Sequence, residues 1–112
     1  MWTFAPQILL TVAVTLNGAG ATFPAPLYNK WFQTFEERHP HIKIEYAAVG
    51  SGAGIERMKS GSVDFAASDA PLSDADLAAM PKPVRQVPSV AGGVVPISNL
   101  PGIPRDLRFT PG

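Results

Sequence analysis

The stretch KIEYAAVGSGAGIERMKSGSVDFAAS at residues 43–68 predicts a strand, a helix and a second strand. Residues 43–49 and 63–68 are rich in β-branched and aromatic positions, as strands are. Between them we expect a flexible glycine-rich loop at 50–54 and a short helix over 55–59. A strand, helix, strand order at this spacing favours an α/β fold with a mostly parallel sheet flanked by helices.

A longer amphipathic helix is predicted upstream, over residues 26–38. Leu27, Trp31 and Phe35 recur at the i, i+4, i+8 spacing of one helix face, and Tyr28 and Phe32 widen that apolar stripe. We expect the stripe to face the core. His39-Pro40 ends this helix, because a residue before proline avoids the helical region.

A first strand is expected around residues 16–18, followed by a tight turn at Gly18-Ala19-Gly20. Downstream, Ser73 precedes acidic residues and is expected to cap a short helix. Two extended pieces are expected at 86–90 and 93–98.

Composition excludes several classes of function. Of the 112 residues, 46% are hydrophobic, so composition does not predict disorder. Nine basic and nine acidic residues cancel, which gives no electrostatic reason to expect nucleic acid as a partner. There is no cysteine, and His39 and His41 have no acidic partner at metal spacing, so no metal site, cofactor or thiol nucleophile is expected.

The N-terminal segment has two interpretations. Residues 8–16 form an apolar stretch of the length of a signal-peptide core, but no Lys or Arg precedes it. It is equally consistent with an apolar extension of the first strand. We therefore expect residues 1–14 to be a degenerate or truncated signal segment and residues 15–112 to be the folded part.

Three loops follow the predicted strands, and parallel sheets bind ligands where their strands end. These loops supply Thr22, Ser51 and Asp69. The first two offer hydroxyl groups next to predicted helix N-termini, which suit anions, and neither loop contains Lys or Arg. Each residue alone is as well explained as a cap or a turn. Their placement at successive strand ends favours an oxyanion site held by dipoles.

Asp69 is the unusual member of this set, because a carboxylate repels an anion. It becomes useful when the anion still carries a proton that the carboxylate can accept. Phosphate near neutral pH keeps a proton and sulfate does not, so one acid among neutral donors predicts selectivity for phosphate.

A dinucleotide site is the main alternative from these motifs. Residues 18–23 are Gly-Ala-Gly-Ala-Thr-Phe, so the third glycine of the dinucleotide fingerprint is missing. Glu45 lies near the position where a ribose-binding acid would be needed, which keeps a nucleotide-dependent oxidoreductase open as an alternative.

Three stretches carry a family resemblance: GAGATFPAPLYNKW at 18–31, VGSGAGIERMKSGSVDFAASDAPLSD at 49–74 and PSVAGGVVPISNLPG at 88–102. They resemble, in order, the phosphate-binding proteins of phosphate ABC transporters. The resemblance implies a periplasmic-binding-protein fold of the second topological class (class II), with phosphate buried between two lobes. It implies no enzyme activity, and it implies ABC permease subunits as partners.

The same resemblance implies which residues bind phosphate. They are Thr22, Phe23 through its backbone, Ser51 and Asp69. It also implies a periplasmic or extracytoplasmic location, or a cytoplasmic one if the N-terminal segment fails as a signal.

Length is the departure from the family. Its members have a second lobe that supplies further ligands, and nothing after Gly112 supplies them. We expect residues 15–112 to be a partial N-terminal lobe whose binding is weak or absent. A non-functional gene fragment remains a further alternative.

Overall fold

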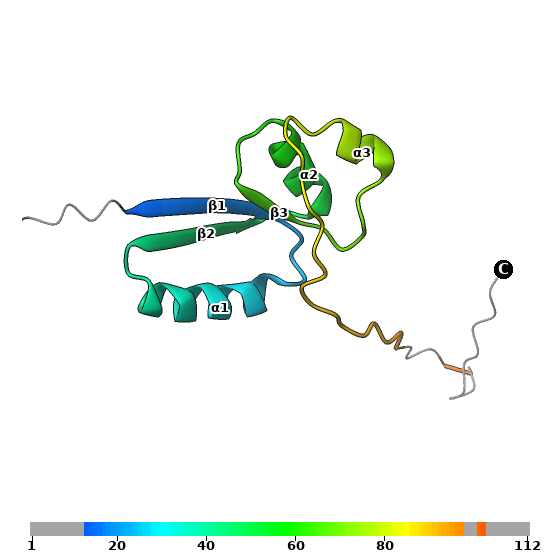
Figure 1. Cartoon of the computed structure of the whole chain (residues 1–112). Helices are drawn as coiled ribbons and strands as arrows, with labels where there is room; N and C mark the ends of the chain where they lie inside the picture. Colours follow the sequence, from blue (N-terminus) through cyan, green and yellow to red (C-terminus); the bar gives the residue numbers. More distant parts are fainter. Residues whose placement is uncertain (1–12, 98–100, 103–112) are drawn as a thin grey trace, which may run out of the picture.

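The computed structural model describes residues 13–97 and 101–102, and Figure 1 shows how their elements are arranged. Their order is β1 (Val14–Gly20), α1 (Ala25–Arg38), β2 (Ile42–Ala48), α2 (Ser51–Lys59), β3 (Phe65–Ala67) and α3 (Asp74–Ala78). This alternation confirms the α/β class. The expected signal segment lies almost wholly outside the described residues.

The three strands form one parallel sheet in the order β2-β1-β3. Gly18 is the register partner of both Tyr46 on β2 and Phe65 on β3. Two further hydrogen bonds join β1 to the residue just before β3. Asp64 N donates to Asn17 O at 2.7 Å, and Asn17 N donates to the Asp64 carboxylate at 2.8 Å. The predicted parallel neighbours are therefore confirmed.

The expected tight turn at Gly18-Ala19-Gly20 is wrong, because these residues form the last part of β1. Both glycines serve close packing between strands. A Cβ on Gly18 would lie 2.6 Å from the Phe65 ring atom Cε1, and one on Gly20 would lie 2.7 Å from Ala67 N. Gly20 also has a φ of 145°, which a residue with a Cβ rarely adopts.

Helix α2 begins at Ser51, so the expected flexible loop over 50–54 is also wrong. Gly50, with a φ of 92°, makes the turn out of the sheet and precedes the helix. Gly54 is buried where α2 crosses β1: a Cβ there would lie 2.9 Å from Ala19 O. The glycines therefore let the helix approach the sheet closely.

Helix α1 packs against the sheet with one side of the predicted apolar stripe, the side of Tyr28 and Phe32. Leu27, Trp31 and Phe35 are 42%, 46% and 40% exposed. Tyr28 and Phe32 instead contact the sheet, where they meet the Tyr46 and Phe65 rings at centroid distances of 5.5–6.4 Å. The apolar stripe is wider than the part that the sheet covers, so periodicity alone did not show which side of the stripe is buried.

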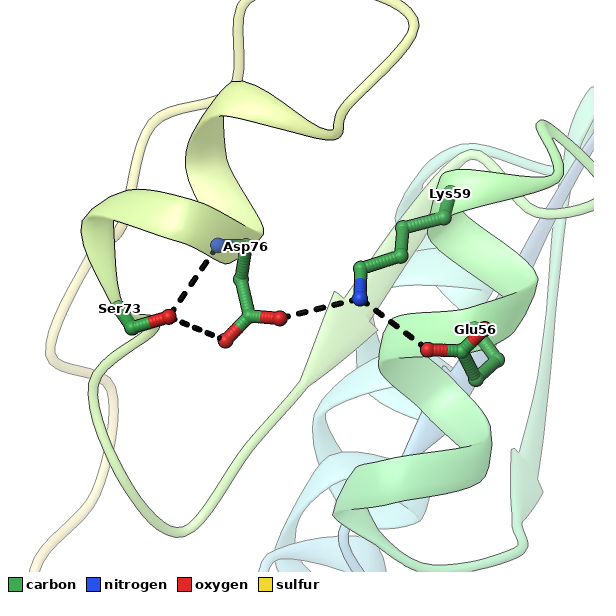
Figure 2. Close-up of polar contacts among 4 residues, drawn as sticks. All are labelled: Glu56, Lys59, Ser73 and Asp76. Carbon is green, nitrogen blue, oxygen red and sulfur yellow. Dashed lines mark hydrogen bonds and ion pairs between the residues drawn. The ribbon is translucent and has the colours of Figure 1, made fainter.

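Helix α3 confirms the predicted cap. The Ser73 hydroxyl accepts from Asp76 N at 3.1 Å and donates to the Asp76 carboxylate at 2.7 Å. Lys59 on α2 bridges Asp76 at 3.0 Å and Glu56 at 3.1 Å, as Figure 2 shows. This ion-pair network connects α3 to α2.

The segment after α3 runs past the β3 side of the sheet toward the start of α1 (Figure 1). Its polar anchors are Gln86, which accepts from Leu72 N at 2.7 Å, and Ser89, which lies 2.6 Å from the Tyr28 hydroxyl. The pieces expected to be extended at 86–90 and 93–97 join no strand of the sheet, and residue 98 lies outside the described part.

The core is small. Ala19 and Ala21 are the fully buried hydrophobic residues of the described chain, and Val94 and Ile97 are more than nine-tenths exposed. Within residues 13–97 and 101–102, none of the helices combines the length and apolar character needed to cross a membrane.

Candidate functional site

The carboxyl ends of all three strands are tied together by backbone hydrogen bonds. Ala21 N, just after β1, donates to Ala67 O at the end of β3 at 2.9 Å. Val49 N and Gly50 N, just after β2, both donate to Gly20 O at 3.1 and 2.8 Å. The three loops that the sequence singled out therefore leave the sheet from one short stretch of its edge.

Ser51 and Asp69, which are 18 residues apart, meet at this edge. The Ser51 hydroxyl accepts from Asp69 N at 3.1 Å and donates to the Asp69 carboxylate at 3.3 Å. Ser51 is half-buried and Asp69 is exposed. The longer of these bonds is weak and exposed, so a ligand oxygen could replace it at low cost.

Thr22 and Phe23 lie in the loop between β1 and α1, which starts beside the same strand ends. Thr22 is exposed and Phe23 is 55% exposed. Among the described residues, the Thr22 side chain shares no hydrogen bond with Ser51 or Asp69. The structure thus brings Ser51 and Asp69 into contact, and leaves Thr22 and Phe23 on the neighbouring loop.

Two helices begin at this edge, and their first turns contain no acidic residue. In α2 the first backbone bond back to the turn is from Gly54 N to Gly50 O at 3.0 Å, which leaves the N–H groups of residues 51–53 without a partner inside the helix. In α1, Pro26 has no N–H, and Ala25 N and Leu27 N already donate to Thr22 O and Pro24 O, so the unpaired N–H groups belong to α2. Unpaired N–H groups and the positive end of the helix dipole favour an anion.

Tyr46 is a residue that the sequence analysis treated only as part of a strand. Its hydroxyl donates to Ala21 O at 2.7 Å, directly before Thr22. Partial burial raises the pKa of Tyr46, and the charges of Tyr28 and Asp69 raise it further, so the hydroxyl keeps the proton it donates. In the sequence, the only indication of this role is that a tyrosine lies two positions before the end of a strand.

A cavity of about 1200 Å³ adjoins the site on the open side of β3. Asp69, Phe23, Phe65 and Arg85 are among the residues that line it, but Thr22 and Ser51 are not. Its lining is largely apolar and comes from β3 and from the segment after α3, so it is a gap in the packing between them rather than a cradle for an anion.

Metal and dinucleotide sites gain no support here. Among the described residues, no three His, Asp or Glu side chains gather closely enough to bind a metal ion. Gly18 and Gly20 lie within β1, so they cannot form the tight turn that approaches a pyrophosphate. Glu45 is exposed in mid-strand on β2.

Comparison with known proteins agrees with this geometry. The family model for the PBP superfamily domain matches residues 6–111. The phosphate-binding protein PstS of Pasteurella multocida is 41% identical over 100 residues, which are 89% of this chain and 28% of that protein. The PstS of Xylella fastidiosa is 39% identical over 109 residues, which are 96% of this chain and 29% of that protein.

A solved structure shows the same arrangement of elements. The ABC-type phosphate transport receptor from Vibrio cholerae superposes with a TM-score of 0.53 at 26% identity, over 55% of this chain and 25% of that one. The chain therefore spans between a quarter and three-tenths of the length of these relatives. From its family match and its parallel α/β sheet, the chain belongs to the PBP superfamily.

Proposed function

We propose that this chain contributes to binding inorganic phosphate, as part of the extracytoplasmic solute receptor of an ABC phosphate importer. The observation that carries the proposal is the Ser51–Asp69 contact, at 3.1 and 3.3 Å, beside the N-terminus of α2. It combines a hydroxyl donor, a proton acceptor and unpaired N–H groups at one end of a parallel sheet.

Each proposed ligand has a distinct role. Ser51 turns its hydroxyl from the Asp69 carboxylate to a phosphate oxygen, and the Asp69 oxygen that is released accepts the P–OH proton. Thr22 donates its hydroxyl from the adjacent loop, and Phe23 donates its backbone N–H. No charged donor takes part in this half of the site, so dipoles hold the anion.

The remaining parts of the receptor follow from this role. Residues 15–112 form part of the N-terminal lobe, and a second lobe closes over the anion. The receptor delivers phosphate to the permease subunits of the transporter and catalyses no reaction. Residues 1–14 are the remnant of an export signal, which places the receptor in the periplasm or another extracytoplasmic space.

A chimera tests this function with a complete second lobe. The stretch of 100 residues that aligns with the Pasteurella multocida relative, at 41% identity, replaces the matching segment of that protein. Calorimetric titration with inorganic phosphate is expected to show binding, and titration with sulfate is expected to show much weaker binding.

Two comparisons make the result specific. The Ser51→Ala chimera should bind phosphate more weakly, whereas Ser60→Ala, a serine at the far end of α2, should bind like the parent chimera. A folded chimera that binds no phosphate, or one whose affinity is indifferent to Ser51, would contradict the proposal.

A further inference from the structure

The Tyr46 hydroxyl bonds to the backbone directly before Thr22, whose side chain shares no hydrogen bond with Ser51 or Asp69 in the described part of the chain. It donates to Ala21 O at 2.7 Å, and Ala21 N donates to Ala67 O at 2.9 Å. Both polar backbone groups of Ala21 are therefore paired, and Ala21 is fully buried. The residues that follow it are Thr22 and Phe23, both exposed.

The Tyr46 ring is itself held from several sides. It stacks on Phe65 with a centroid distance of 6.0 Å and an interplanar angle of 17°, and it meets the Tyr28 ring edge-on at 5.5 Å. Gly18 lies between the two stacked residues in the strand register, and a Cβ there would collide with the Phe65 ring. Because the ring is held in this way, its hydroxyl keeps one position next to the Ala21 carbonyl.

Fixing the Ala21 carbonyl has a consequence for the anion. An unpaired carbonyl oxygen near the site would repel an oxyanion, and it would leave the following peptide free to rotate. With the carbonyl bonded to Tyr46, the peptide that joins Ala21 to Thr22 keeps one orientation. The backbone N–H groups after it are then presented in one geometry, which lowers the ordering cost of binding.

We propose that Tyr46 is a positioning residue for the anion site: its hydroxyl fixes the Ala21–Phe23 loop so that Thr22 and Phe23 meet the ligand in one conformation. This inference rests on the proposed function for its ligand, inorganic phosphate. The fixing of the loop itself does not depend on that ligand and can be measured in its absence.

Tyr46→Phe in the full 112-residue chain is the test, because it keeps the ring and removes only the hydroxyl. Tyr28→Phe is the matched control, since it removes a hydroxyl that pairs with Ser89 instead of the loop. Amide hydrogen exchange is read at Ala21 and Ala25, whose N–H groups bond to Ala67 O and Thr22 O. Val14 N, bonded to His41 O at the far end of the sheet, reports on general loosening.

In Tyr46→Phe, exchange at Ala21 and Ala25 is expected to rise about two- to tenfold, the effect of losing one hydrogen bond, with Val14 unchanged. Tyr28→Phe should leave Ala21 and Ala25 unchanged. Equal exchange in wild type and Tyr46→Phe, or a rise of the same size at Val14, would overturn the inference.

A titration of the same chains with inorganic phosphate separates this inference from the proposed function. If wild type shows phosphate-dependent amide shifts, Tyr46→Phe should need a severalfold higher phosphate concentration for the same shift, and an unchanged titration would overturn the positioning role. If wild type shows no shift, the proposed function fails for this chain, and the role of Tyr46 in positioning the anion site fails with it. The exchange rates still decide whether Tyr46 fixes the loop.

Discussion

Gly54→Ala tests the close approach of α2 to β1 that places Ser51 beside Asp69. A Cβ at residue 54 would lie 2.9 Å from Ala19 O and 3.0 Å from Gly20 N, against an ordinary contact of 3.4 Å or more. All of these atoms are backbone, so the helix must retreat by about 0.5 Å or more. Overpacking of this kind costs about 1–3 kcal/mol of unfolding free energy.

Gly52→Ala is the matched control on the same helix, because a Cβ at residue 52 has nothing within 4 Å. Both substitutions replace glycine by alanine within α2, and each gains up to about 1 kcal/mol of helix propensity. The difference between the two variants therefore isolates the collision. We expect Gly52→Ala to be at least as stable as wild type, and Gly54→Ala to be less stable than Gly52→Ala by about 1–3 kcal/mol.

Urea unfolding followed by far-UV circular dichroism measures this difference, with trimethylamine oxide added to maintain a folded baseline. In the chimera, Gly54→Ala should also weaken phosphate binding, because Ser51 moves with the helix. If the unfolding free energies of the two variants agree within about 0.5 kcal/mol, the collision does not exist and the account of α2 is wrong.

Further expectations concern selectivity, acid stability and the size of the core. In the chimera, where the second lobe covers the anion and Asp69, Asp69→Asn should reduce the preference for phosphate over sulfate by about 5- to 150-fold, the cost of a covered polar group left unpaired. Titration with both anions measures this preference, and an unchanged value would leave Asp69 as a turn residue. Ser51→Ala should weaken the binding of phosphate and of sulfate to the same extent, because the Ser51 hydroxyl donates to any oxygen. A loss of affinity for only one of the two anions would count against this role. Hydrogen bonds from Lys43 and, to a smaller extent, from Ile44 N lower the pKa of Glu36 from its ordinary value of 4.5. The ionised carboxylate therefore stabilises the fold above pH 4.5, and this stabilisation is lost as the pH falls through the lowered pKa. The stability difference between wild type and Glu36→Gln should therefore shrink on acidification, and a constant difference would refute the pairing. Finally, the chain on its own should be marginally stable, because so few residues are fully buried, and strong hydrogen-exchange protection throughout β1, β2 and β3 would contradict this.

The sequence was sufficient to predict the alternation of strands and helices and the parallel pairing of the strands, since these follow from periodicity and from the spacing of strand, helix and strand. The order of the strands in the sheet was not predicted. It was also sufficient for the Ser73 cap, whose side chain makes the predicted bond to Asp76 N. The cap is local, and the parallel pairing follows from the alternation of strands and helices, because a helix that crosses over between two strands makes them parallel.

Glycine was the main source of error. Gly18 and Gly20 were assigned to a turn, and the segment at 50–54 to a flexible loop, because glycine is commonest where chains bend. In the structure Gly18 makes room for the Phe65 ring and Gly54 for the β1 backbone. The close approach of distant segments depends on tertiary structure. Local composition alone does not show whether a glycine permits such an approach or makes the chain flexible.

Side-chain contacts between distant residues were predicted unevenly. The carboxyl-end rule brought Ser51 and Asp69 to one edge, and they do meet. The Tyr46 hydroxyl was missed, since its bond to Ala21 O depends on the exact register of β2 against β1. The apolar stripe of α1 was predicted, but only its Tyr28 and Phe32 side contacts the sheet, while Leu27, Trp31 and Phe35 stay exposed.

The central claim is that the loops after β1, β2 and β3 together form part of a phosphate site. The most direct test is an NMR titration of the 112-residue chain with inorganic phosphate and, separately, with sulfate at equal ionic strength. The account predicts that phosphate shifts the backbone amide signals of Thr22, Phe23, Ser51 and Asp69, and that sulfate shifts them far less. Equal shifts with both anions, or phosphate shifts confined to residues away from this edge of the sheet, would contradict it.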